Sequence, residues 1–214
     1  MKTERRFFPV EVRADESGNI TGHAAVFYRE ADPGTEFELF PGLVERIMPN
    51  AFDRAVAEDD VRALFNHDSN QVLGRNRAGT LQLTVDDKGL RFDIDPPDTQ
   101  LGRDLQVSLK RGDITGSSFA FRAVEEKFIV KDDNTEVREI HAAELFDVGP
   151  VTFPAYTAAD SSARDLQSAI EAERERRDAD EPEEPPAPKV APEPDPKIQA
   201  DADALALRIK IANG

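Results

Sequence analysis

The sequence contains no cysteine and no tryptophan, and it has only three histidines among its 214 residues. Without cysteine, the chain has no disulfide, no thiolate ligand for zinc and no cysteine nucleophile. No apolar run reaches the roughly 20 residues that a membrane-spanning helix needs, and residues 1–15 lack the apolar centre of a signal peptide. These absences predict a cytosolic protein without a membrane partner.

Positive charge is also scarce. The 27 lysines and arginines face 43 aspartates and glutamates, and the net charge is −16. Binding to a nucleic acid backbone requires clustered basic residues, so no nucleic-acid partner is expected. The sequence has neither a P-loop nor a GxGxxG pattern, and we predict no cofactor.

The acidic residues and prolines are concentrated near the C-terminus. Seven of the 15 prolines lie between Pro182 and Pro196, in a segment too poor in apolar residues to form a core. The last segment alternates leucine and isoleucine with other residues, which suits a strand that docks on a partner or frays. We therefore predict four parts: a folded domain (1–160), a short surface helix (161–178), an acidic, proline-rich disordered linker (179–200) and an apolar C-terminal segment (201–214).

Short runs of Val, Phe, Leu, Ile and Thr dominate residues 1–160, and Gly, Asp, Asn and Pro separate them. This pattern is typical of β-strands. The clearest hairpin covers residues 81–94, where apolar residues alternate on both sides of the sequence DDKG. Two helices are expected, one over 49–60 with Asn50 as its N-cap and one over 98–113. The prediction is a mainly β protein of the α+β class, a small barrel or sandwich decorated by helices.

Three parts of this β region carry residues suited to acyl transfer. His67 stands in the sequence FNHD at the end of an expected strand, and Ser118 begins another, on the face opposite Phe119 and Phe121. Asp147 lies in a third. A serine, a histidine and a carboxylate can act as nucleophile, base and orienting group.

Simpler interpretations exist for each of these residues. A serine beside glycine commonly forms a turn, and a carboxylate on a strand is usually solvated. His23, His67 and His141 could together hold zinc, but no close pair of ligands supports this, and we predict no metal site.

A series of motifs in fixed order makes a more specific case. They read GHAAVF, ERIMPNAFD, ALFNHD, VLGRNRAGTLQL, DDKGLRFDID, LKRGDITGSSFAF and ELFDVGPVTFPAY. Over most of residues 5–160 the chain resembles the HK97-type prohead proteases of tailed bacteriophages, which are related in fold to the herpesvirus assemblins. The resemblance implies a closed antiparallel β-barrel surrounded by helices, with His67 as the general base and Ser118 as the nucleophile.

Two departures from the family pattern bear on the site. Ala120 takes the place of a glycine after the serine. The late motif reads LFDVG, with Asp147 at the acidic place and Gly149 where the family usually has serine. Asp147 is the first choice for the third member of the site. Glu144 is an alternative, and so is His141, because the assemblins use a histidine there.

The resemblance also implies a function. A serine endopeptidase would act in the bacterial host cytoplasm, inside the assembling procapsid, on a scaffold protein or the scaffolding segment of the major capsid protein, and on itself. A homo-oligomer is compatible with this role. The alternative is a non-catalytic scaffold or assembly protein that keeps the protease fold.

Overall fold

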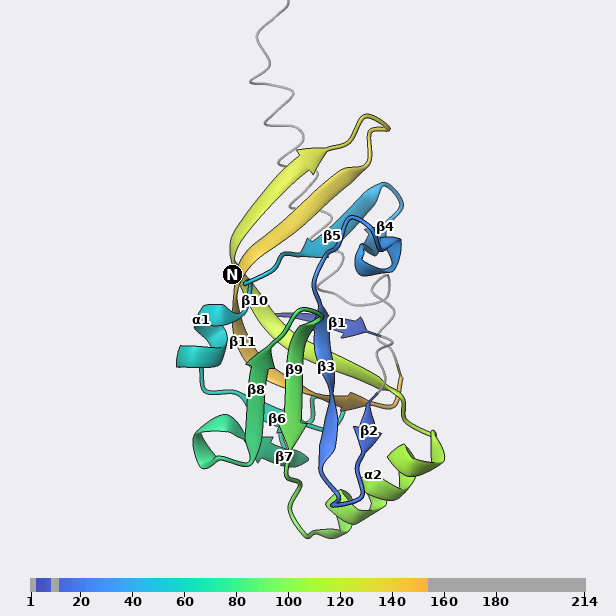
Figure 1. Cartoon of the computed structure of the whole chain (residues 1–214), viewed down its shortest axis with the longest axis vertical. Coiled ribbons are helices and arrows are strands. Elements are labelled where there is room, and N and C mark those ends of the chain that lie inside the picture. The colour runs from blue at the N-terminus through green and yellow to red at the C-terminus, as the bar shows by residue number, and fades with distance from the viewer. Residues whose placement is uncertain (1–2, 9–11, 154–214) are drawn as a thin grey trace, which may run out of the picture. The chain divides into compact units, whose positions relative to one another are not determined.

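Two β-sheets form most of the computed structural model, which describes residues 3–8 and 12–153 (Figure 1). In the larger sheet the strand order is β1-β10-β11-β5-β4, and β6 pairs with both β11 and β7. Its strands are β1 (Glu4–Phe8), β4 (Phe37–Phe40), β5 (Leu43–Ile47), β6 (Arg62–Leu64), β7 (Val72–Arg75), β10 (Gly116–Val130) and β11 (Glu136–Val151). The smaller sheet, of order β2-β3-β9-β8, comprises β2 (Arg13–Ala14), β3 (Ile20–Val26), β8 (Leu81–Val85) and β9 (Gly89–Ile94).

The long strand β11 organises the larger sheet. It pairs antiparallel with β10 along its length, parallel with β5 through Glu136–Ile140, and parallel with β6 through Asp147 and Val148. The prediction of a closed antiparallel barrel surrounded by helices is wrong. Both sheets are open, two of the pairings are parallel, and the described residues contain few helices. Apolar alternation reports which face of a strand is buried, but not whether the outer strands of a sheet meet.

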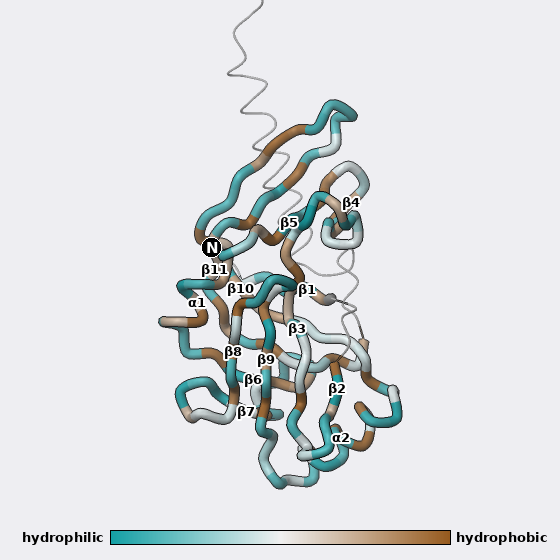
Figure 2. Tube along the Cα trace, in the orientation of Figure 1, coloured by the Kyte–Doolittle hydropathy of each residue, from teal (hydrophilic) through white to brown (hydrophobic). Residues whose placement is uncertain are grey.

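One apolar cluster draws on both sheets and on the helices. Phe52 meets the ring of Phe119 edge to face at a centroid distance of 5.5 Å, and Phe119 lies 4.9 Å from Phe121. Phe92 of the smaller sheet belongs to the same cluster, and all four rings are fully buried. Burying one such ring contributes about 1.5–3 kcal/mol. The alternating apolar and polar stretches of β8 and β9 are visible in Figure 2.

The predicted hairpin and second helix are confirmed. β8 and β9 pair from Leu81 with Ile94 to Val85 with Leu90. Helix α2 (Gln100–Arg111) lies beside β2 (Figure 1), and its N-cap Thr99 accepts a hydrogen bond from the backbone N–H of Gly102. Short 3-10 helices cover Pro33–Thr35 (η1) and Asn76–Ala78 (η2).

The first helix is shorter than predicted. Helix α1 covers Asp53–Glu58, and its N-cap is Phe52, which makes no side-chain cap bond. Asn50, the predicted cap, lies in the preceding turn with φ of 71°, a left-handed conformation that asparagine tolerates well. The same residue type suits both positions, and the sequence pattern did not separate them. The predicted surface helix, linker and C-terminal segment lie outside the described residues.

Candidate active site

Ser118 lies near the start of β10, in the middle of the larger sheet. It pairs with Phe7 on β1 and with Gly149 on β11, and it is 2% exposed. The preceding Gly116 fits against the ring of Phe7, because a Cβ at that glycine would come within 2.1 Å of the ring. The strand start is therefore packed too closely for a larger residue, and this packing fixes where the serine stands.

His67 occupies the loop between β6 and β7. Asn66 and His67 have φ values of 54° and 57°, two consecutive left-handed residues that turn the chain sharply. The Asn66 side chain accepts a hydrogen bond from the backbone N–H of Thr152 at 2.8 Å and donates one to its hydroxyl at 3.2 Å. Asp68 accepts a bond from the backbone N–H of Asn70 at 2.8 Å. The polar residues around the histidine thus build the turn and anchor it to the end of β11.

The turn brings His67 to both of its expected partners. Its Nε2 lies 2.6 Å from the Oγ of Ser118, and its Nδ1 lies 2.5 Å from Oδ1 of Asp147. A carboxylate at Nδ1 requires a proton on that nitrogen, which leaves Nε2 of a neutral ring free to accept from the serine hydroxyl. The side chains of His67 and Asp147 are only 10% and 13% exposed, so little water competes for these bonds.

The other two candidates for the third member lie elsewhere. Glu144 pairs with Arg122, and His141 lies 3.1 Å from a carboxylate oxygen of Glu139. Of the three predicted candidates, the structure brings only Asp147 into contact with His67.

The serine hydroxyl has a second acceptor that the sequence did not suggest. Ser118 Oγ lies 2.9 Å from the backbone carbonyl oxygen of Arg6 on β1. A hydroxyl has a single proton, and it can go to only one acceptor at a time. With neutral His67 the proton can point to Nε2, and with protonated His67 it can point only to the Arg6 carbonyl.

The departures at Ala120 and Gly149 fit the local packing. Ala120 is 1% exposed and pairs with Asp147, so its methyl group is accommodated next to the site. At Gly149, a Cβ would lie 2.0 Å from the backbone oxygen of Leu64 on β6. Glycine is needed here because β6 approaches β11 closely, and that approach lets the following loop present His67.

A buried network of charges next to the site was missed. Glu45 is 1% exposed and accepts bonds from Arg6 at 2.6 Å and from Arg138 at 2.9 Å. Glu4 accepts from both arginines, and although burial alone would raise its pKa, the hydrogen bond from Arg138 and the two positive charges lower it. Burial opposes the charge of Arg138 too, but Glu4 and Glu45 raise the pKa of its guanidinium.

The alternation of apolar and polar residues along β5 indicated a buried charge at Glu45. Glu45 stands between Leu43 and Ile47 at period two, so the residue falls on the buried face of its strand. A carboxylate there needs a buried partner of opposite charge.

No group of three or more potential metal-binding side chains occurs in the part of the chain that the structure describes. His23 lies 2.8 Å from Asp86, and each of the three histidines contacts a different carboxylate. Among residues 3–8 and 12–153, no helix is long and apolar enough to cross a membrane.

Of three comparisons with known proteins, one found a match. No curated protein and no solved structure matches the chain. The family model described as caudovirus prohead serine protease matches residues 8–172, a range that includes His67, Ser118 and Asp147. The chain therefore belongs to the caudovirus prohead serine protease family.

Proposed function

We propose that this capsid maturation protease is a serine endopeptidase in which Ser118 is the nucleophile, His67 the general base and Asp147 the group that orients the base. One observation carries the proposal: a continuous chain of contacts, 2.5 Å from Asp147 to His67 and 2.6 Å from His67 to Ser118. Both distances are short enough for proton transfer and for fixing the tautomer of the ring.

The reaction proceeds in two halves. Ser118 Oγ attacks the scissile carbonyl carbon while its proton moves to Nε2 of His67, and the negative charge of Asp147 stabilises the imidazolium. The C–N bond then breaks as Nε2 returns the proton to the leaving amine. In the second half a water molecule, deprotonated by His67, attacks the acyl-enzyme, and Ser118 recovers its proton as the ester bond breaks.

The substrates we propose are a scaffold protein or the scaffolding segment of the major capsid protein, and the protease itself, inside the procapsid. Family membership supports the capsid substrates. Self-cleavage is supported by the sequence of the region 179–200, because its composition predicts a disordered linker and exposed segments of that kind are preferred sites of proteolysis. The apolar segment 201–214 is proposed as a docking element for enclosure in the shell.

Covalent labelling tests the chemistry without a known substrate. The purified chain is treated with a fluorophosphonate, which loses fluoride when a nucleophilic serine attacks phosphorus, and the adduct is located by peptide mass spectrometry. We expect labelling of Ser118 and its loss in His67→Ala.

Coexpression with the cognate capsid protein tests the substrates. Intact masses are compared between the wild type and Ser118→Ala, and we expect trimming at defined peptide bonds only with the wild type. If Ser118 is not labelled and both samples stay full length while the partners assemble, the non-catalytic scaffold is the better description.

A further inference from the structure

We call Ser118, His67 and Asp147 the triad. The pairing of four neighbouring strands places arginines on the same face of the larger sheet as Ser118 and Asp147. Partners in adjacent strands point to the same face. One row of partners across β10, β11, β6 and β7 consists of Ala120, Asp147, Arg62 and Arg75. Arg62 is therefore the neighbour of the carboxylate that contacts His67.

Three arginines in this region share one carboxylate. Asp60 lies 2.5 Å from Arg75, 3.3 Å from Arg62 and 4.0 Å from Arg77. We call Arg62, Arg75 and Arg77 the arginine patch. Within this ion-pair group, three positive charges face the single negative charge of Asp60, in a chain whose net charge is −16. The pKa of Asp60 is lowered to about 2. The main cause is the hydrogen bond from Arg75, and the positive charges of Arg62, Arg75 and Arg77 add to it.

Nearby carboxylates are engaged elsewhere. Glu58 pairs with Arg54 at 3.5 Å, and Asp59, although it keeps its charge, accepts a bond from the backbone N–H of Leu145 at 2.8 Å and forms no ion pair with the three arginines in the part of the chain that the structure describes. Arg62 and Arg77 also donate to backbone carbonyls, of Asp60 at 2.7 Å and of Glu58 at 3.1 Å, but a carbonyl does not neutralise their charge. Their side chains are 43% and 60% exposed, so both charges are accessible to a ligand.

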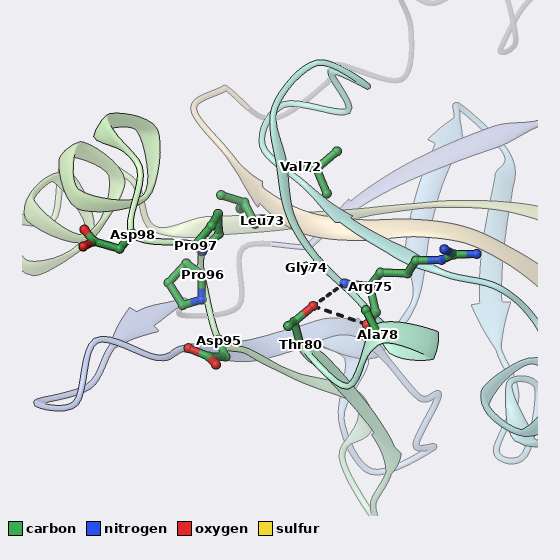
Figure 3. A pocket seen from close by; sticks show the side chains of 10 residues that line it. All are labelled: Val72, Leu73, Gly74, Arg75, Ala78, Thr80, Asp95, Pro96, Pro97 and Asp98. Atoms are coloured by element: carbon green, nitrogen blue, oxygen red, sulfur yellow. Dashed lines mark hydrogen bonds between the residues drawn. The ribbon is translucent and has the colours of Figure 1, made fainter.

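One member of the patch, Arg75, also lines a neighbouring cavity whose wall carries two aspartates. A cavity of about 560 Å³ opens between β7 and residues 95–98, and its lining includes Asp95 and Asp98 but no triad residue. Figure 3 shows the guanidinium of Arg75 pointing away from these two aspartates. The backbone N–H of Arg75 donates to the Thr80 hydroxyl at 3.0 Å, which helps hold this end of β7 in place.

Strand spacing gives the distance from the patch to the nucleophile. Neighbouring strands lie about 4.8 Å apart, so β6 is about 10 Å and β7 about 14 Å across the sheet from Ser118 on β10. An extended peptide advances about 3.3 Å per residue. A peptide that is cleaved at Ser118 and runs across the strands toward β7 therefore has residues over the patch roughly three to five positions from the cleaved bond.

We propose that the arginine patch is a substrate subsite that selects extended acidic peptides, with Asp or Glu about three to five residues from the cleaved bond. This inference rests on the proposed function, because it takes Ser118 as the point of cleavage. The chain itself contains a sequence of the required kind: residues 178–186 carry five carboxylates and no basic residue.

Cleavage specificity is the first test. The full chain is incubated with a denatured proteome digest, and the cut sites are identified by mass spectrometry. We expect acidic residues to be enriched three to five positions from the cut, and Arg62→Gln/Arg77→Gln to reduce the preference for acidic over neutral peptides about fivefold, in KM rather than kcat. Arg103→Gln/Arg111→Gln, which removes two exposed charges from α2, leaves the preference unchanged. Cleavage without any acidic preference overturns the inference but leaves the protease intact.

A binding experiment tests the subsite independently of catalysis. A labelled peptide of residues 178–186 is titrated into Ser118→Ala, and fluorescence anisotropy gives its Kd. We expect binding that weakens with added salt and is about fivefold weaker when Arg62→Gln/Arg77→Gln is added. If this result holds while no preparation cleaves anything, the subsite stands and the proposed function fails. If the peptide binds equally with and without the patch, or does not bind, the subsite is rejected.

Discussion

The triad and the buried charge network lie next to each other in the larger sheet, and they differ in how their protons and charges are shared. In the triad, a single hydroxyl proton on Ser118 faces two acceptors, the ring of His67 and the carbonyl of Arg6. In the charge network, Arg6, Arg138, Glu4 and Glu45 pair with one another. A site that performs acid–base chemistry needs a proton with more than one place to go, whereas a structural network needs every charge compensated.

The largest expected effect is on activity, in variants that change the triad and leave the charge network intact. Ser118→Ala and His67→Ala should each lower kcat about 10⁴-fold or more, and Asp147→Asn by about 10⁴-fold because the ring loses its tautomer. Folding should be nearly unchanged, which circular dichroism and thermal unfolding check. His141→Ala and Glu144→Gln are the matched controls and should retain activity. Activity lost in Glu144→Gln but kept in Asp147→Asn would contradict our choice of the third member.

The second expected effect is on stability, in a variant that removes one member of the charge network and keeps the triad side chains. Glu45→Ala strips Arg6 and Arg138 of a buried partner, and we expect a loss of about 3–5 kcal/mol in the free energy of unfolding. Urea denaturation measures it. Glu58→Ala removes a carboxylate that pairs with Arg54 at the surface, where the two side chains are 65% and 48% exposed, and should cost less than about 1 kcal/mol. Equal losses in the two variants would mean that burial does not distinguish these ion pairs.

The third effect concerns the close approach of β6 to β11, on which the position of His67 depends. Gly149→Ala puts a methyl group against the Leu64 carbonyl, and we expect about 3 kcal/mol of destabilisation together with lower activity, because the His67 loop follows β6. Gly34→Ala, whose Cβ would meet only the Asp32 side chain at 3.3 Å, serves as the comparison and should cost much less. A stable and fully active Gly149→Ala would show that β6 can move without disturbing the site.

The smallest effect is a pH dependence that belongs to the network. The pKa of Glu4 is lower in the folded chain than its usual value, so its contribution to stability is fully present above about pH 4.3 and is lost as the pH falls through the folded pKa. The free energy of unfolding of the wild type should therefore fall more steeply below about pH 4.3 than that of Glu4→Gln. Ser118→Ala removes no carboxylate and should follow the wild type. Parallel curves for wild type and Glu4→Gln would rule out this role of Glu4.

Prediction from sequence succeeded where the information was local. The hairpin of β8 and β9 follows from alternation around DDKG, and the leucines of α2 follow from helical spacing. The position of His67 in a polar turn was also readable, because Asn66 and Asp68 are residues that favour such turns. Motif order led to the family. The tail boundaries and the catalytic roles remain predictions.

Prediction failed where distant strands had to be compared. Nothing local to β1 or β4 tells whether the ends of the sheet join, and the expected barrel was wrong for that reason. The contact of Asp147 with His67, rather than of Glu144 or His141, depends on the register of β11 against β6. A shift of one residue would turn Asp147 to the other face of the sheet.

The sequence by itself determined the strands, the polar turn and the residue types able to perform acyl transfer, because these depend on neighbours within a few positions. Tertiary structure alone decided which of the three candidates contacts His67, the open sheets, the buried pairing of Arg6 with Glu45 and the grouping of arginines around Asp60. Each of these joins residues from separate strands or loops, and their distances are set by strand register and by the close approach of β6 to Gly149.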